Sequence, residues 1–129
     1  MSQIHIVDTQ NAPKAVGPYS QAVIHHGVLY ASGQIGLDPL TAKLVGDDVL
    51  LQARQVTANL SAVLDEAGAS LCHILKVNIF LTDMADFPAI NAVYAEWLGD
   101  HRPARATVAV AALPLAAKIE MDLVARVRV

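Results

Sequence analysis

The chain has 129 residues, of which 54% are hydrophobic and only 16% are charged, and its formal net charge is −3 at pH 7. This length suits one domain over residues 1–129, and a negative charge without a Lys/Arg stripe argues against nucleic-acid binding, which depends on neutralising phosphates. A single cysteine excludes an internal disulfide, and no apolar run approaches the ~20 residues that span a bilayer, so we expect no membrane segment.

The start of the chain has neither the layout of a secretory signal nor the Arg-rich pattern of a transit peptide, so we expect a cytoplasmic protein. Charged residues are scarce beside the share of about a quarter that is usual in soluble domains. A small domain of this composition has more apolar surface than it can hide. The composition therefore predicts association of identical subunits.

The first third of the chain predicts three strands. Residues 3–7 alternate apolar and polar side chains, and an ordered loop follows, since residues 11–19 contain two prolines and a glycine. Residues 21–25 and 28–32 also have strand character. The His26-Gly27 pair between them predicts a tight hairpin turn, because glycine tolerates a positive φ.

A helix and a strand are predicted in the middle of the chain. Apolar residues recur at three- and four-residue spacing over 49–67, which indicates an amphipathic helix. Asp47 or Asp48 is expected to cap its start, and Gly68 follows its end. Residues 74–82 are rich in β-branched and bulky side chains with few polar ones, which is typical of a central strand.

The last third of the chain predicts a second helix and two strands. The helix follows Asp86, whose side chain is expected to cap it, and ends at Gly99. Strands are predicted over 105–113 and 118–129, which gives the order βββαβαββ. This order indicates an α+β fold, a mixed β-sheet with two helices packed on one face. Another copy of the chain is the expected cover for the opposite face, with small-molecule pockets where the copies meet.

Arg105 and Glu120 are the most informative ionisable residues, because residues 106–117 between them carry no charge. A charge in or beside a packed sheet is costly unless it meets a partner, a ligand or water. If the last two strands form a hairpin, these residues face each other or are offset by about one residue pair, and the sequence does not fix the register. On the charges alone, a cross-strand salt bridge is the simpler interpretation, and an anion receptor at Arg105 is the alternative.

Hydroxyl groups and glycines gather in the two segments that contain Tyr19, Ser32 and Gly33. Each segment is predicted at a loop or a strand end, where backbone N–H groups are free to bind a ligand. Ordinary turn chemistry is the simpler explanation for such residues. They are therefore candidates for a binding site rather than a signature of one.

The second predicted helix carries one polar residue, Asn91, that could mark a subunit interface. Tyr94 and Trp97 have the spacing of core residues and are expected to pack. The five histidines lack the spacing of metal ligands, so no metal site is predicted.

Several segments follow one another in the order NAPKAVGPYSQA, LYASGQIGLDPLTAKLV, DDVLLQARQVTANLSAVLDEAG, VNIFLTDMADFPAINAVYAEW and RPARATVAVAALPLAAKIEMDLVA. Together they cover nearly the whole chain and resemble the RidA (YjgF) family of reactive-intermediate deaminases. The resemblance implies a chorismate-mutase-like fold and a homotrimer with clefts between its subunits. It further implies hydrolysis of 2-imino and 2-enamino acids, such as 2-iminobutanoate and 2-iminopropanoate, to 2-oxo acids and ammonia without a metal or organic cofactor.

The resemblance also implies roles for individual residues. Arg105 would bind the substrate carboxylate through two parallel hydrogen bonds, a geometry that lysine cannot reproduce. Glu120 would hold and activate the attacking water. The polar wall of the site would be completed by the backbone of Gly33 and Thr107 and by the side chains of Tyr19, Ser32 and Asn91.

Two positions depart from the family's usual pattern: Thr107 stands where many members have cysteine, and Arg102 where they have an apolar residue. Arg102 adds positive charge near the cleft, which favours a longer or more acidic imine. Two alternatives for the function stay open: a non-catalytic regulatory trimer that binds small carboxylates, and an aminomuconate-type deaminase with a bulkier substrate. The family's ribonuclease and chaperone roles fit this acidic chain poorly.

Overall fold

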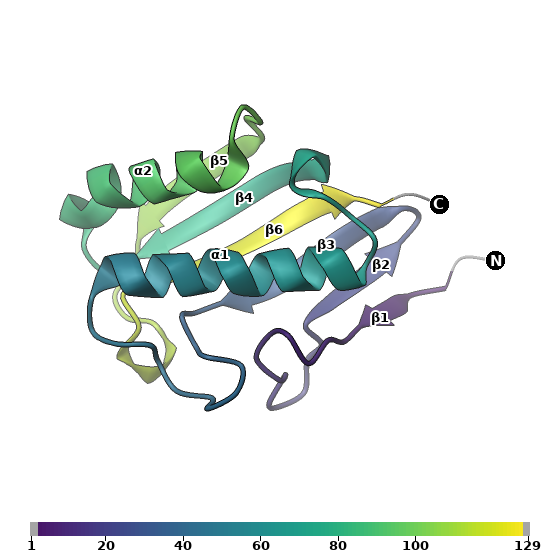
Figure 1. The fold of residues 1–129 in the computed structure, drawn as a ribbon, viewed down its shortest axis with the longest axis horizontal. Helices are drawn as coiled ribbons and strands as arrows, with labels where there is room; N and C mark the ends of the chain where they lie inside the picture. Colours follow the sequence, from purple (N-terminus) through teal and green to yellow (C-terminus); the bar gives the residue numbers. More distant parts are fainter. Residues whose placement is uncertain (1–2, 128–129) are drawn as a thin grey trace.

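The computed structural model describes residues 3–127 as one mixed sheet with two helices (Figure 1). The order of the elements along the chain is the predicted one, and the α+β class is confirmed. The strands are β1 (His5–Val7), β2 (Ala22–His25), β3 (Val28–Gln34), β4 (Ile74–Leu81), β5 (Ala104–Ala109) and β6 (Ile119–Arg126), and the helices are α1 (Val49–Glu66) and α2 (Phe87–Leu98).

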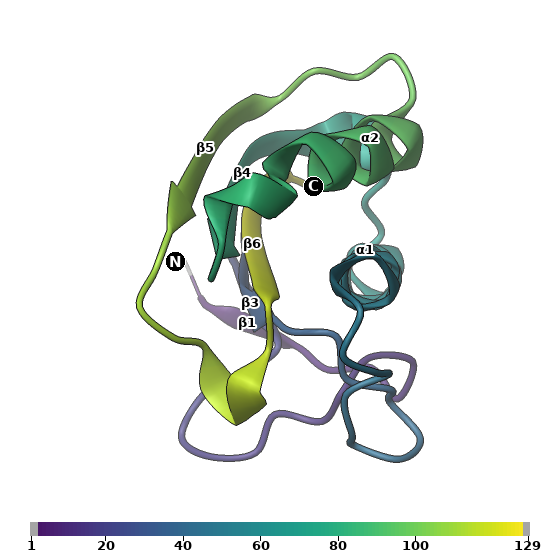
Figure 2. The ribbon, with the colours of Figure 1, turned by 90° about the vertical axis from the view of Figure 1, so that its left-hand side faces the viewer.

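Both helices lie on the same face of the sheet, as Figure 2 shows in a view along it. The core fills the space between these layers, where Leu60 of α1, Val77 of β4 and Ile90 of α2 are fully buried. Burying one such side chain contributes about 1.5–3 kcal/mol. The helices are also joined by a hydrogen bond of 2.9 Å, which Trp97 Nε1 donates to Ser61 Oγ. The buried core and this hydrogen bond together fix the position of α2 against the sheet.

The hairpin between β2 and β3 is confirmed. His26 and Gly27 form its turn with φ values of 51° and 75°. Two consecutive positive φ angles match the twist of a two-residue hairpin, and glycine adopts the second without steric cost. The turn thereby sets the register that pairs Val23 with Tyr30.

The last two strands do not form the hairpin that the sequence left open. The sheet order is β1-β2-β3-β6-β4-β5, so β4 lies between β5 and β6. β5 runs parallel to β4 at the edge of the sheet, after the crossover through α2, whereas β6 is antiparallel to both of its neighbours. A parallel pair needs such a crossover, and spacing along the chain does not reveal which strand fills the neighbouring position. β5 also ends at Ala109, and the predicted strand residues 128–129 lie outside the described residues.

The two helix starts differ from each other. Asp48 caps α1 as predicted, because its carboxylate accepts a hydrogen bond from the Leu50 backbone N–H at 3.4 Å. The predicted cap at Asp86 is wrong: its side chain makes no capping bond, and its own φ and ψ are already helical. Asp83 instead caps the preceding 3₁₀ turn by accepting from the Ala85 N–H at 3.0 Å. An N-cap residue must have a non-helical backbone, so the cap moves to the start of that turn.

The face of the sheet opposite the helices is uncovered in the single chain (Figure 2). The ladder registers place Ile6, Val23, Tyr30 and Val124 in one row across this face. Ile6 is 70% exposed and Tyr30 is 49% exposed. An apolar row of this kind is typical of an interface with another protein surface. Among residues 3–127, neither helix is long and apolar enough to cross a membrane.

Candidate functional site

Arg105 lies on the helix side of the edge strand β5. It pairs in register with Val77 of β4, which is buried beneath the helices, and paired residues point to the same face of a sheet. Its Nη1 donates a hydrogen bond of 2.6 Å to Oδ1 of Asn91. The guanidinium carbon lies 5.2 Å from the ring centroid of Phe87 and 4.9 Å from that of Tyr94. We call Arg105, Asn91, Phe87 and Tyr94 the arginine cluster.

The arginine cluster holds a cation without neutralising it. The Arg105 side chain is exposed in the single chain, and within residues 3–127 no carboxylate forms a salt bridge with it. The cross-strand salt bridge to Glu120 is therefore wrong. Ring faces attract a guanidinium, and one amide oxygen orients it, so several donor N–H groups stay available for an anion.

A cavity of about 490 Å³ opens beside the arginine cluster, lined by Asn91, Tyr94, Ala95, Arg102, Pro103 and Arg105. Burial raises the pKa of the Tyr94 phenol above its usual value, although the nearby Arg105 and Arg102 charges act to lower that pKa. The phenol therefore keeps its proton at neutral pH. It is a buried hydrogen-bond donor on a residue that lines a cationic cavity.

Thr107 lies two residues beyond Arg105 on the same side of β5, in register with the buried Ile79. Its hydroxyl oxygen is buried and has no hydrogen-bond partner within the described part of the chain. A buried hydroxyl without a partner costs about 1–3 kcal/mol. Such a group can be satisfied by a water, a ligand or another copy of the chain at this strand edge.

Glu120 belongs to the opposite side of the sheet. It pairs with Phe80 on β4, and its chain neighbour Ile119 is fully buried toward the helices. Because side chains alternate along a strand, Glu120 points to the uncovered face, whereas Arg105 points toward α2. Within one chain these two side chains are thus separated by the sheet.

Gly33 lies directly against the Glu120 carboxyl group. A Cβ atom at Gly33 would collide with that group, so the close approach requires glycine. The pairing of β3 with β6 is irregular here, because Ala31 pairs with Leu123 and Gln34 with Met121, which leaves two residues of β3 opposite one of β6. This bulge brings the β3 backbone next to the carboxyl group.

Burial raises the pKa of the Glu120 carboxyl above its usual value of 4.5, and the negative charge of Asp122 raises it further. Asp122 follows two residues later on the same face and accepts a hydrogen bond of 2.9 Å from Nδ2 of Asn78. A carboxylate with a raised pKa is a stronger base than an exposed one. This is the property that a general base needs.

A second cavity, of about 430 Å³, lies beside Glu120. Tyr19, Gly33 and Glu120 line it together with Leu115. The rest of the lining is Pro13, Lys14, Val16, Gln34, Ile35, Leu37, Pro39, Ala42 and Pro114. Leu115 and its neighbour Ala116 have positive φ values of 56° and 58°. Left-handed backbone at non-glycine residues costs about 1–2 kcal/mol each, and such strain is concentrated at functional sites. We call Glu120, Gly33 and Tyr19 the glutamate cluster.

Six of the seven candidate residues from the sequence thus fall into two groups. Arg105, Asn91 and Thr107 lie on the β5 and α2 side, and Tyr19, Gly33 and Glu120 line the cavity on the other. The Ser32 hydroxyl is already engaged, because it donates a hydrogen bond of 2.6 Å to the Ser20 carbonyl oxygen. That bond ties the loop before β2 to β3.

Phe87 and Tyr94 are candidates that the sequence did not indicate. Tyr94 is buried, in agreement with the packing prediction, but its ring also faces Arg105. The signal was present as spacing: Phe87, Asn91 and Tyr94 follow at intervals of four and three, which places them on one helix face. Core spacing and a binding face have the same period, so the pattern alone does not separate them.

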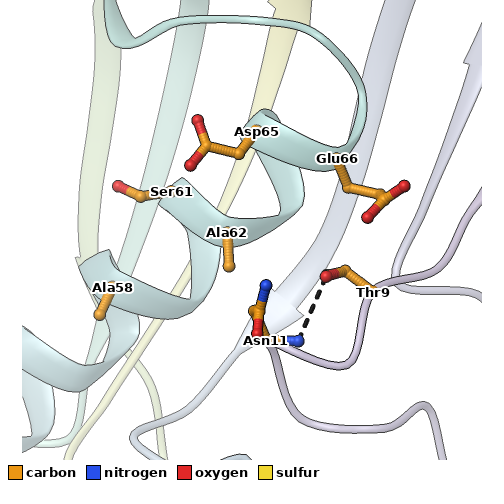
Figure 3. Close-up of a pocket in the computed structure, with 7 residues that line it drawn as sticks. All are labelled: Thr9, Asn11, Ala58, Ser61, Ala62, Asp65 and Glu66. Atoms are coloured by element: carbon orange, nitrogen blue, oxygen red, sulfur yellow. Dashed lines mark hydrogen bonds between the residues drawn. The ribbon is translucent and has the colours of Figure 1, made fainter.

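A third cavity, of about 500 Å³, separates α1 from the loop after β1 (Figure 3). Thr9 and Asn11 of the loop face Ser61, Asp65 and Glu66 of the helix across it, and Ala58 and Ala62 complete its wall. It contains two carboxylates and no cation, so it disfavours an anionic ligand. Within residues 3–127, no three His, Cys, Asp or Glu side chains gather in a way that could hold a metal ion.

The sequence matches known proteins over almost its full length. The family described as endoribonuclease L-PSP matches residues 9–127. A RutC family protein of Pyrococcus horikoshii is 45% identical over 120 residues, which cover 93% of this chain and 95% of that protein. The 2-iminobutanoate/2-iminopropanoate deaminase of Capra hircus is 40% identical over 120 residues, which cover 93% of this chain and 88% of that protein.

Solved structures share the fold. A Rid family protein of unknown function from Yersinia pestis has a TM-score of 0.95 at 44% identity, covering 97% of this chain and 100% of its own. TdcF of E. coli, crystallised with bound serine, has a TM-score of 0.91 at 38% identity and covers 96% of this chain and 99% of its own. The chain therefore belongs to the endoribonuclease L-PSP family, which includes the YjgF, RidA and RutC proteins.

Proposed function

We propose that this protein hydrolyses small 2-imino and 2-enamino acids to 2-oxo acids and ammonia. The observation that carries the proposal is a pair of complementary groups. One is a guanidinium with no carboxylate partner among residues 3–127, and the other is a carboxyl group with a raised pKa beside a cavity. The first suits the substrate carboxylate and the second suits the attacking water. The deaminase name of the Capra hircus relative supports the same reaction class.

The complete site is formed between copies of the chain. Arg105 and Glu120 lie on opposite sides of one sheet, with β4 between their strands, so a single chain does not bring them to one small substrate. The uncovered face offers an apolar surface to a neighbour. In a closed homotrimer, the arginine cluster of one copy lies next to the glutamate cluster of the neighbouring copy at each subunit interface.

In this arrangement Arg105 binds the substrate carboxylate. Asn91 occupies Nη1, and the remaining N–H groups form parallel hydrogen bonds to the two carboxylate oxygens. Phe87 and Tyr94 hold the guanidinium plane at the cavity edge. The bound carboxylate fixes the imine carbon relative to the neighbouring copy, which replaces an encounter in solution by a fixed geometry.

Glu120 activates the water. Its carboxylate accepts a proton from the water as the oxygen attacks the carbon of the protonated imine, and the resulting tetrahedral carbon carries both a hydroxyl and a neutral amino group. The protonated Glu120 then gives this proton to the amino nitrogen. The C–N bond breaks to release ammonia, and the hydroxyl proton passes to the Glu120 carboxylate as the C=O bond of the ketone forms. The burial and the Asp122 charge that raise the Glu120 pKa make it effective in both directions.

A second candidate is a non-catalytic regulator that binds small carboxylates in the same cleft. A relative from Lactococcus lactis, named a putative regulator AldR, is 43% identical over 123 residues. Arg105 would serve this function equally, whereas the raised pKa of Glu120 would have no use in it. Endoribonuclease activity, which the family description names, is poorly supported by a net charge of −3.

The proposal is tested by generating 2-iminobutanoate with an amino-acid dehydratase in the presence of an amine that traps it. The protein is expected to reduce the trapped product by hydrolysing the imine first, and Arg105→Ala is expected to abolish this effect. Arg54→Met is the matched control, since Arg54 is an exposed arginine of α1 that pairs with Glu96 and lines neither cluster. If the protein gives no gain over buffer but binds 2-oxobutanoate, the regulator is the correct function.

A further inference from the structure

The cavity beside the arginine cluster carries more positive charge than a single carboxylate needs. Arg102 and Arg105 both line it, and the lining contains no carboxylate. Arg105 alone can bind one carboxylate through its free donors. The second guanidinium therefore has no function in the hydrolysis of a monocarboxylic imine.

Arg102 is oriented by hydrogen bonds to the backbone, although its side chain is exposed. Its Nη1 donates to the carbonyl oxygens of Gly99 and His101, at the C-terminal end of α2. A cation there is favoured by the helix dipole. Its other guanidinium nitrogens form no hydrogen bond with residues 3–127, so they can face a ligand. The helix end thus orients a charge into the cavity.

Tyr94 supplies an independent observation in the same cavity. Its side chain is only 6% exposed, and its hydroxyl has no hydrogen-bond partner among residues 3–127. A buried hydroxyl without a partner is costly, and its proton needs an acceptor. Both Arg102 and Arg105 are close enough to act on the charge of this phenol. An anionic oxygen would satisfy all of these groups together.

We infer that this cavity binds a second carboxylate, and that the protein prefers 2-imino acids whose side chain ends in a carboxylate. The inference rests on the proposed function. Arg105 binds the carboxylate next to the imine carbon, and Arg102 and the Tyr94 hydroxyl bind the distal one. Water adds across the C=N bond, the C–N bond breaks, and a dicarboxylic 2-oxo acid and ammonia leave, with no change in oxidation state.

The test compares two imines made in place by amino-acid oxidases, 2-iminoglutarate and 2-iminobutanoate. The protein is expected to hydrolyse the dicarboxylic imine about tenfold more efficiently, the effect of one added charge-assisted hydrogen-bond pair. Arg102→Met is expected to bring this ratio close to one. Arg102→Lys keeps a charge at the helix end and is expected to keep part of the preference, and Arg54→Met is expected to keep all of it.

Tyr94→Phe separates binding from folding. It removes only the hydroxyl, so the melting temperature is not expected to fall, whereas the preference for the dicarboxylic imine is expected to fall several-fold, an effect of about one hydrogen bond. Equal efficiency for both imines in the wild-type protein would overturn the inference and leave the deaminase proposal standing. A ratio that survives Arg102→Met would overturn it as well.

Binding of the product distinguishes a failure of the proposed function from a failure of this inference. Calorimetry with 2-oxoglutarate and 2-oxobutanoate needs no catalysis. If neither imine is hydrolysed but 2-oxoglutarate binds about tenfold more tightly through Arg102, the second carboxylate site stands and the deaminase proposal fails. If 2-oxoglutarate binds no better than 2-oxobutanoate, the inference is wrong whatever the activity.

Discussion

The arginine cluster and the glutamate cluster are built in opposite ways. Arg105 is exposed, yet it is oriented by two aromatic rings and an amide oxygen. Glu120 is partly buried and is pressed against the Gly33 backbone near a second acidic residue, Asp122. The first environment leaves donor N–H groups of the guanidinium available for an anion. The second environment disfavours the charged form and creates a base.

This contrast explains why the proposed mechanism needs both clusters. An anion next to Glu120 would add to the Asp122 repulsion that, after burial, raises the Glu120 pKa, whereas an anion next to Arg105 meets a guanidinium whose remaining donors are available. Hydrolysis of an anionic imine needs both environments at a short distance. Because the sheet separates them within one chain, assembly is part of the proposed mechanism.

The largest expected effect comes from the base. Glu120→Gln keeps the shape beside Gly33 but removes the proton acceptor, so the rate of imine hydrolysis is expected to fall about 10³-fold, as for the loss of a general base. The measurement is the turnover rate at saturating imine. The binding of 2-oxobutanoate is expected to persist, and its loss along with turnover would show that Glu120 binds substrate rather than activates water.

A smaller effect is expected when the arginine is replaced by lysine. Arg105→Lys keeps the positive charge but loses the parallel hydrogen bonds and the contact with the rings, which lowers kcat/KM about 10- to 100-fold. The loss is expected in KM, because the group holds the carboxylate. Unchanged kinetics would mean that a point charge is enough and that the guanidinium geometry has no role.

The pH dependence of the activity tests the role of Glu120 in the glutamate cluster. As a base, Glu120 works only when ionised, so activity falls as the pH drops through its raised pKa. Asp122→Asn removes one of the two causes of that rise while keeping an acceptor for Asn78, so the acid limb of the activity profile is expected to move to lower pH. Asp65→Asn on α1 serves as the control. A limb that stays in place would exclude Glu120 as the titrating base.

The smallest expected effect concerns the support of the arginine cluster. Trp97→Phe removes the hydrogen bond to Ser61 that joins α2 to α1, and is expected to lower the free energy of unfolding by about 1 kcal/mol. Urea unfolding at equal protein concentration measures this. Tyr94→Phe removes a hydroxyl that has no partner among the described residues, so its cost is expected to be smaller. A larger loss of unfolding free energy for Tyr94→Phe than for Trp97→Phe would contradict the assignment of a hydrogen bond to Trp97 and of none to the Tyr94 hydroxyl.

Much of the fold could be predicted because it depends on local patterns. The His26-Gly27 turn, the Asp48 cap and the amphipathic period of α1 are each encoded within a few residues. The position of β6 between β3 and β4 is not local, since it depends on a crossover that spacing does not describe. The Asp86 cap was wrong because a 3₁₀ turn precedes α2 and extends its helical backbone.

The sequence predicts the candidate residues more reliably than their arrangement. Arg105 and Glu120 stood out by their isolation in an apolar segment, but a hairpin would have placed them on one face. The contact of the Tyr94 ring with Arg105 cannot be predicted from the sequence, because core residues and binding residues recur along a helix with the same period. Side-chain identity is local information, whereas the face of the sheet on which a side chain lies depends on register and strand order.

Subunit mixing tests the central claim, that each site combines the arginine cluster of one copy with the glutamate cluster of another. Arg105→Ala and Glu120→Gln are each expected to be inactive alone. The two variants are unfolded together and reassembled in equal amounts. About a quarter of the subunit interfaces then combine an intact Arg105 with an intact Glu120, so about a quarter of the wild-type activity is expected to return. A mixture that stays as inactive as its components would contradict the account.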